Sequence, residues 1–183
     1  GTAFQERVDL LEAVDWTGID LALYGEWGLL SKRSPLKRFV KDGYIQNAHT
    51  AALYQRATIG LNLYRTSKGF GKDCGHIDAA DSLNPRAYEL AATGCFSISD
   101  YRAEVSEVFG EAVPTFRRPE DLRPLIDRWL QDDVGRARLT AQAQQAVAAD
   151  TWRVRATEMI SHLTDAGIVA RGDSPAHTVA VAA

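Results

Sequence analysis

Cysteine is scarce in this chain, and long apolar runs are missing from it. Its 183 residues include two cysteines, Cys74 and Cys95. Two cysteines do not make the disulfide framework of a small secreted domain. No apolar run reaches the length of about 18 residues that a membrane-spanning helix needs. We therefore expect a reduced, cytoplasmic setting and no membrane span.

An excess of charge of one sign is missing as well. The chain has 21 Lys and Arg against 24 Asp and Glu, which gives a net charge of -3 and no reason to expect nucleic-acid binding. Its 45% hydrophobic and 25% charged residues are typical of a globular domain with a sizeable core. The sequence starts without an initiator methionine, Gly1 leads at once into a helical pattern, and we expect no signal peptide. We expect that a strand before Gly1 is missing.

Short apolar runs alternate with amphipathic segments along the chain. Buried strands are expected at residues 19–24, 44–45, 59–64, 96–100 and 112–116. Helices are expected at residues 4–14, 49–56, 84–93, 104–109, 119–131 and 133–149, and from 150 or 151 onward. This alternation favours an α/β fold in which a Rossmann-like parallel sheet lies between two layers of helices. Residues 1–166 would form the domain and residues 167–183 a flexible tail.

Two helices carry further expectations. Pro124 lies inside the predicted helix 119–131, where it should cause a kink or a late start. In the last helix, one face is apolar and must pack against something. Its members are Trp152, Ala156, Met159, Ile160 and Leu163.

The most informative segment surrounds the helix that starts near residue 84. Asn84 is a good N-cap, and Pro85 suits the first helical position. Arg86 and Glu89 follow on one face, three residues apart. A helix N-terminus beside an arginine favours phosphate, and a neighbouring glutamate suits sugar hydroxyls. Because parallel sheets bind ligands beyond the carboxyl ends of their strands, this segment indicates a nucleotide site.

Each candidate residue also has a purely structural interpretation. Arg86 and Glu89 would then be an ion pair within one helix, worth a few tenths of a kcal/mol. Arg7, in the first helix, either reaches phosphate or lies in solvent. Gly25 either makes a tight turn or lets the backbone approach a ligand closely. Asn62 interrupts an apolar strand and either binds neighbouring backbone or shapes the pocket for a base.

The polar loop at residues 65–81 does not match other known sites. Residues 69–72 (GFGK) lack the first glycine and the following Ser or Thr of a Walker A loop. Cys74, His76 and Asp78 are too few for a metal site of clear geometry. We therefore expect no metal, and interpret the loop as a flexible part of the ligand site.

Several short motifs, taken together, resemble one known family. They are ATIGLNL at 57–63, NPRAYELAATG at 84–94, SDY at 99–101, PEDL at 119–122 and TWRVRA at 151–156. In order and spacing they resemble the C-terminal, donor-binding domain of GT-B glycosyltransferases, especially the CgeB-like branch of glycosyltransferase group 1. The segments at 1–7 and 23–25 look like the first loop and second strand of the same domain.

This resemblance implies a half-enzyme that holds a nucleotide diphosphate sugar without a metal ion. Glu89 would bind the ribose, and Arg86 with the helix start at Asn84 would face the diphosphate. Asp81 occupies the position of a second carboxylate near the transferred sugar, although its local sequence differs. The acceptor, which stays unidentified, would bind to an N-terminal domain that we expect to be missing here. Alone, the chain should bind nucleotide weakly and catalyse nothing.

Two other functions fit part of the pattern. The chain could be a non-catalytic nucleotide-binding module, or a structural or interaction module, that kept the fold. A nucleotide-sugar epimerase or a dehydrogenase would need G-x-G-x-x-G after its first strand. No such motif precedes the predicted helix at 4–14.

Overall fold

The computed structural model describes residues 1–43, 45–66, 68, 75, 77 and 81–169. The chain divides into two compact units, residues 1–148 and 149–183.

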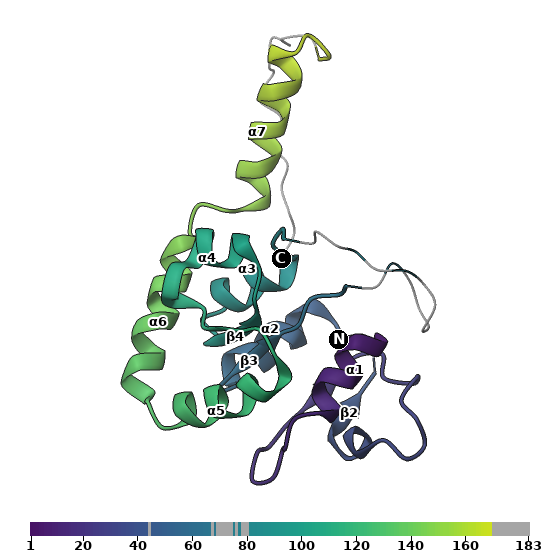
Figure 1. Ribbon diagram of the computed structural model, residues 1–183. Helices are drawn as coiled ribbons and strands as arrows, with labels where there is room; N and C mark the ends of the chain where they lie inside the picture. The colour runs from purple at the N-terminus through teal and green to yellow at the C-terminus, as the bar shows by residue number, and fades with distance from the viewer. Residues whose placement is uncertain (44, 67, 69–74, 76, 78–80, 170–183) are drawn as a thin grey trace. The chain divides into compact units, whose positions relative to one another are not determined.

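The first unit alternates strands with helices, as the apolar pattern predicts (Figure 1). In chain order its elements are α1 (Gln5–Glu12), β1 (Leu23–Tyr24), the 3₁₀ helix η1 (Pro35–Phe39), β2 (Val40–Asp42), α2 (Asn47–Arg56), β3 (Gly60–Asn62), α3 (Pro85–Ala92), β4 (Ser97–Asp100), α4 (Ala103–Phe109), η2 (Gly110–Ala112), β5 (Thr115–Phe116), α5 (Pro119–Leu130) and α6 (Asp133–Ala146). The predicted α/β class is confirmed.

All the strand pairs in the described residues are parallel, in two separate sheets. One sheet has the order β3-β4-β5, with Asn62 opposite Ser99. The other pairs β1 with β2, and an isolated parallel bridge joins Thr2 to Glu26. Every parallel pair needs a crossover connection, and α3 and α4 with their loops supply these between β3, β4 and β5.

Helices cover both faces of the larger sheet, which gives the three layers that the sequence predicts. Ile98 of β4 packs in one core with Leu122 and Ile126 of α5. A second core contains Ala91 of α3 and Val105 of α4. Figure 1 accordingly places α3 and α4 on one side of β3 and β4, and α5 on the other.

Glycine at position 60 lets α3 lie close to β3. A Cβ atom there would come within 2.6 Å of Leu90 Cδ2 and 3.0 Å of Cys95 Sγ. Leu90 itself is 1% exposed. The helix that starts at the predicted site is therefore held directly against the sheet.

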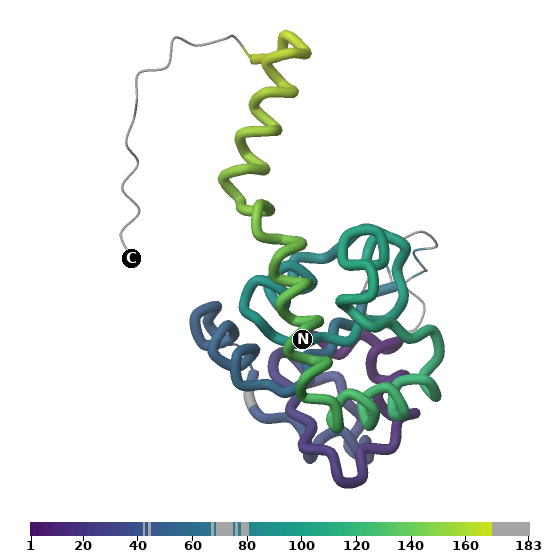
Figure 2. Tube along the Cα trace, turned by 90° about the vertical axis from the view of Figure 1, so that its left-hand side faces the viewer, coloured from purple at the N-terminus to yellow at the C-terminus, as the bar shows by residue number. Residues whose placement is uncertain are grey.

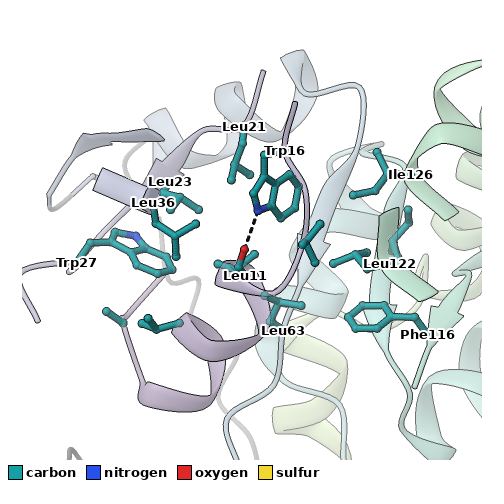
Figure 3. Close-up of a cluster of buried hydrophobic side chains, with 14 of the residues drawn as sticks. Leu11, Trp16, Leu21, Leu23, Trp27, Leu36, Leu63, Phe116, Leu122 and Ile126 are labelled. Atoms are coloured by element: carbon teal, nitrogen blue, oxygen red, sulfur yellow. Dashed lines mark hydrogen bonds between the residues drawn. The ribbon is translucent and has the colours of Figure 1, made fainter. Parts of the chain in front are cut away.

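The N-terminal part of this unit shares the apolar core of β4 and α5, and Figure 3 draws side chains from both parts. Leu11 and Leu36 are almost completely buried there, together with Trp16. The Trp16 indole Nε1 donates a hydrogen bond to the Leu11 carbonyl at 2.7 Å, so its polar atom is satisfied inside the core. In Figures 1 and 2 the purple residues of this part and the green α5 lie at the same lower end of the unit.

Some predicted element bounds are wrong. The strand expected at 19–24 contains only Leu23 and Tyr24, because residues 16–21 turn back on themselves and the Ile19 N–H bonds to the Trp16 carbonyl. The next strand lies at Val40–Asp42, not at 44–45, because it follows η1 directly; Ile45 is outside any strand and Tyr44 is outside the described residues.

Of the two outcomes expected at Pro124, a kink or a late start, the late start does not occur. Helix α5 begins at Pro119 and continues through Pro124 to Leu130. Its buried residues Leu122 and Ile126 lie on either side of the proline. Tertiary packing therefore keeps this helix going despite the backbone hydrogen bond that Pro124 cannot make.

The second unit contains helix α7 (Trp152–Asp165), capped by Thr151, whose Oγ1 accepts from the Val154 N–H at 3.2 Å. In this unit taken by itself, Trp152, Met159 and Ile160 are 87%, 59% and 55% exposed, so the packing expected of this apolar face stays a prediction. Residues 170–183 of the predicted tail lie outside the described residues. Across the described parts of both units, no helix has the length and apolarity to cross a membrane.

Candidate functional site

The predicted site residues Asn62 and Asn84 bind each other at the carboxyl end of β3. Asn84 is the N-cap of α3, and its Oδ1 accepts from the Ala87 N–H at 3.0 Å. Its Nδ2 donates to Asn62 Oδ1, also at 3.0 Å. Asn62 is 2% exposed. The buried amide thus binds a neighbouring side chain and positions the N-cap of α3.

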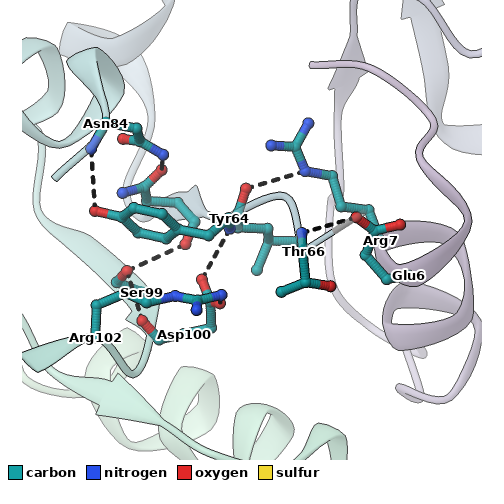
Figure 4. A network of polar contacts seen from close by, with 10 residues as sticks. Glu6, Arg7, Tyr64, Thr66, Asn84, Ser99, Asp100 and Arg102 are labelled. Atoms are coloured by element: carbon teal, nitrogen blue, oxygen red, sulfur yellow. Dashed lines mark hydrogen bonds and ion pairs between the residues drawn. The ribbon is translucent and has the colours of Figure 1, made fainter. Parts of the chain in front are cut away.

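The start of α3 is largely saturated by the protein's own groups. The Asn84 N–H donates to the Tyr64 hydroxyl at 3.4 Å, and Pro85 has no N–H (Figure 4). The Ala87 N–H is bound by the Asn84 side chain. In the described part of the chain, the Arg86 N–H is the first-turn donor that has no assigned partner. This helix end therefore offers an anion one backbone donor.

Arg86 and Glu89 do not form the ion pair that was the structural alternative. Within the described residues, no ion pair involves either side chain. The Arg86 Nε instead donates to the Tyr54 hydroxyl of α2 at 3.2 Å, which holds this half-buried guanidinium. Glu89 is exposed.

Arg7 also lies at the carboxyl end of β3, at the edge of the sheet where α3 starts, and does not extend into solvent. Its Nε donates to the Leu63 carbonyl at 3.0 Å and its Nη1 to the Thr2 carbonyl at 3.3 Å. Burial lowers the pKa of Arg7 below its usual value, and the nearby positive charges of Arg86 and Arg65 lower it further, while the Glu6 and Asp100 carboxylates act in the opposite direction. The fold therefore brings cations together at this edge, which is a favourable environment for an anion.

Three residues that the sequence did not single out complete this edge. The Asp100 carboxylate accepts from the Tyr64 N–H at 2.9 Å and pairs with Arg102 Nη2 at 2.9 Å. The Arg102 guanidinium lies 5.0 Å from the Tyr64 ring centre. Burial raises the pKa of Asp100, although the Tyr64 N–H and Arg102 act in the opposite direction. These contacts fix the position of Tyr64. They therefore also fix the Tyr64 hydroxyl, which accepts from the Asn84 N–H.

A signal for these residues was present in the sequence. Tyr64 ends the apolar run 59–64, and Asp100 ends the run 96–100. Both positions are at the carboxyl ends of predicted neighbouring strands, where side chains converge.

A small hollow opens between α1 and the strand ends. Its volume is about 180 Å³, and the Glu6 carboxylate accepts from the Thr66 N–H at 2.9 Å on its wall. It is lined by Glu6, Arg7, Leu10, Leu63, Tyr64, Thr66 and Asp100. The described edge thus combines a cationic side with a partly apolar recess.

Gly25 makes a close approach to the protein's own backbone. Its φ is +110°, and a Cβ there would lie 2.0 Å from the Gly1 carbonyl oxygen. That carbonyl accepts from the Glu26 N–H at 2.8 Å. The pairing of Gly1 with the chain at Gly25 explains the glycine without a ligand.

The predicted loop at residues 65–81 is described only in part. Asp81 is exposed, and no contact joins it to the other predicted site residues in the described part of the chain. The GFGK segment, Cys74, His76 and Asp78 lie outside the described residues. Among the residues that are described, no three His, Cys, Asp or Glu side chains gather as a metal site would require.

Comparison with known proteins gives one match. A family model described as glycosyl transferase-like matches residues 7–161, which include the carboxyl ends of β3 and β4 and all of α3. No curated protein and no solved structure matches the chain.

Proposed function

The chain belongs to the glycosyl transferase-like family, and we propose that it is the donor-binding, C-terminal domain of a GT-B enzyme of the CgeB-like branch. Its ligand in this proposal is a nucleotide diphosphate sugar. An N-terminal domain supplies the acceptor site, and the transfer takes place in the cytoplasm. The main support is the convergence of Arg7 and Arg86 beside the start of α3.

The diphosphate lies against Arg86 in this proposal. Arg86 offers two groups to the diphosphate. One is its guanidinium, which the Tyr54 hydroxyl holds in place, and the other is its backbone N–H, which has no assigned partner among the described residues. Arg7 adds a second positive charge from α1. Cleavage of the sugar–phosphate bond leaves negative charge on the diphosphate, and cations fixed in advance stabilise that charge as it develops. These groups take the place of a metal ion.

Glu89 accepts hydrogen bonds from the ribose hydroxyls. Its carboxylate is exposed, lies one helical turn beyond Arg86, and forms no ion pair within the described residues. Asp81 contacts the donor sugar. Asn62 and Asn84 act indirectly by holding the start of α3. Gly25 acts indirectly as well, because it lets the backbone there lie close to Gly1.

Calorimetric titration of the full chain with UDP, GDP, their sugars and the free nucleosides tests this proposal. We expect a nucleoside diphosphate to bind. The Arg86→Gln variant should weaken diphosphate binding about 10- to 150-fold, since a hydrogen bond to a charged group is worth about 1.5–3 kcal/mol. It should leave nucleoside binding unaffected. Glu89→Gln should weaken nucleoside and nucleotide alike.

Two exposed residues outside the site serve as controls. Arg128→Gln removes a positive charge from α5, and Glu111→Gln removes a negative charge from η2. Both variants should bind as the wild type does. The proposal is wrong if the full chain binds none of these nucleotides, or if both site variants bind as tightly as their controls.

A further inference from the structure

Residues 29–41 carry five cationic side chains and no acidic one, in a chain whose net charge is -3. The cations are Lys32, Arg33, Lys37, Arg38 and Lys41. We call residues 29–41 the basic segment. It follows β1 in the chain, includes η1, ends within β2, and is part of the dark blue loop of Figure 1.

The fold holds this segment so that its cations face outward. Leu30 and Leu36 are 6% and 0% exposed and belong to the apolar core. The Ser34 hydroxyl donates to the Glu12 carboxylate of α1 and accepts from the Leu36 N–H at 3.3 Å. All five cationic side chains are exposed. The basic segment is therefore an anchored surface and not a loose tail.

The cations have little compensation from the protein. Within the described residues, none of the five forms an ion pair, whereas Arg102, Arg123 and Arg136 each do. One carboxylate, that of Asp15, interacts electrostatically with Arg38, and it also lies 4.0 Å from Arg123. The segment thus keeps a local positive charge that an anionic partner would neutralise.

Apolar side chains lie among these cations. Leu29 is 65% exposed, and Phe39 is half-buried with the Arg38 guanidinium 4.6 Å from its ring centre. An exposed leucine adds nothing to contacts with nucleic-acid phosphates, which depend on cations and polar groups. Cations flanking an exposed apolar side chain are typical of segments that lie on a membrane surface. The combination favours a lipid partner.

We propose that the basic segment docks this chain on an anionic lipid surface. The five cations lie against the lipid headgroups, and the Leu29 side chain enters the boundary between headgroups and acyl chains. This surface is formed by η1 and its flanking residues, and uses none of the residues assigned to the donor site. The proposal stands whether or not the chain binds a nucleotide.

Vesicle flotation of the full chain tests this proposal. The probes are vesicles of phosphatidylcholine alone and of phosphatidylcholine with phosphatidylserine, each at low and high salt. We expect binding to the phosphatidylserine vesicles that weakens with salt. Each basic residue near such a surface strengthens binding about five-fold, so the Lys37→Gln/Arg38→Gln variant should bind about 25-fold more weakly.

A charge-matched control separates the effect of the basic segment from the effect of the chain's net charge. Arg128→Gln/Arg138→Gln removes two exposed cations from α5 and α6 and should bind as the wild type does. Leu29→Ser should lower binding by an amount that does not depend on salt. The unfolding midpoints of all three variants should match the wild type, since every altered side chain is exposed.

Three outcomes would overturn the proposal. One is no binding to phosphatidylserine vesicles, or equal binding to phosphatidylcholine alone. Another is an equal loss in the control pair. The third is retention on a nucleic-acid duplex without binding to vesicles, which would assign the segment to a different class of partner.

Discussion

Replacing Asn84 with alanine should destabilise the first unit far more than a surface substitution does. Two hydrogen bonds are lost: the cap to the Ala87 N–H and the bond to the buried Asn62 Oδ1. Loss of an N-cap costs about 1 kcal/mol. Leaving a buried acceptor unpaired costs about 1–3 kcal/mol more. We therefore expect the free energy of unfolding to fall by about 2–4 kcal/mol.

Urea unfolding followed by tryptophan fluorescence measures this change. Trp16, Trp27 and Trp129 are 5–8% exposed and report on the core of the first unit, whereas Trp152 in the second unit is 87% exposed. The signal change on unfolding therefore comes mainly from the first unit. Asn84→Ser, which keeps a cap oxygen, should recover about 1 kcal/mol of the loss.

A double-mutant cycle with Asn62→Ala isolates the bond between the two amides. Each single variant removes this bond, so the double variant should lose less than the sum of both. The coupling should be about 1–2 kcal/mol. A loss of less than about 0.5 kcal/mol in Asn84→Ala, which is the usual range for surface substitutions, would refute the reasoning. So would a coupling within experimental error of zero.

Two further predictions concern the contact between α3 and the sheet. Gly60→Ala should lower the free energy of urea unfolding by about 1–3 kcal/mol, because the added Cβ would lie 2.6 Å from Leu90 Cδ2. Gly43→Ala should be neutral, because a Cβ there would have no heavy atom within 4 Å, and equal effects of the two variants would contradict the close packing at Gly60. Burial raises the pKa of Cys95 from 9.0 to about 11, so in a Cys74→Ala background its thiol should resist alkylation at neutral pH until urea unfolds the chain. The folded state then holds the Cys95 proton more tightly, and the stability that the neutral thiol provides should be complete below pH 9.0 and lost as the pH rises towards about 11. Rapid alkylation of the native chain, or a stability difference from Cys95→Ala that does not change over this range, would contradict this.

Local sequence patterns were sufficient for most of the helices and for the cap of α3. Asn84 followed by Pro85 predicts a helix start, and the structure shows the Asn84 side chain bound to the Ala87 N–H. These signals work because a cap and a hydrophobic period involve residues within one or two turns. They fail at residues 19–24 and 44–45, where pairing between distant segments decides where a strand begins.

In the candidate site, too, local features could be predicted and contacts between distant residues could not. Arg86, Glu89 and the helix start could be named from their spacing. The Asn62–Asn84 bond, by contrast, joins residues 22 apart, and the Arg7–Leu63 bond joins residues 56 apart. Tyr64 and Asp100 were not named as site residues because an aromatic and an acidic residue at strand ends are common in any α/β domain.

By itself, the sequence determined the α/β alternation, the capped helix at 84 and the resemblance of its motifs to a glycosyltransferase domain. Each of these depends on neighbouring residues or on motif order along the chain. Only the tertiary structure decided that the strands form two sheets, that Asn62 holds the cap of α3, and that Arg7 lies near Arg86. These features depend on which distant segments pack together, and that choice is made by the burial of the whole apolar core.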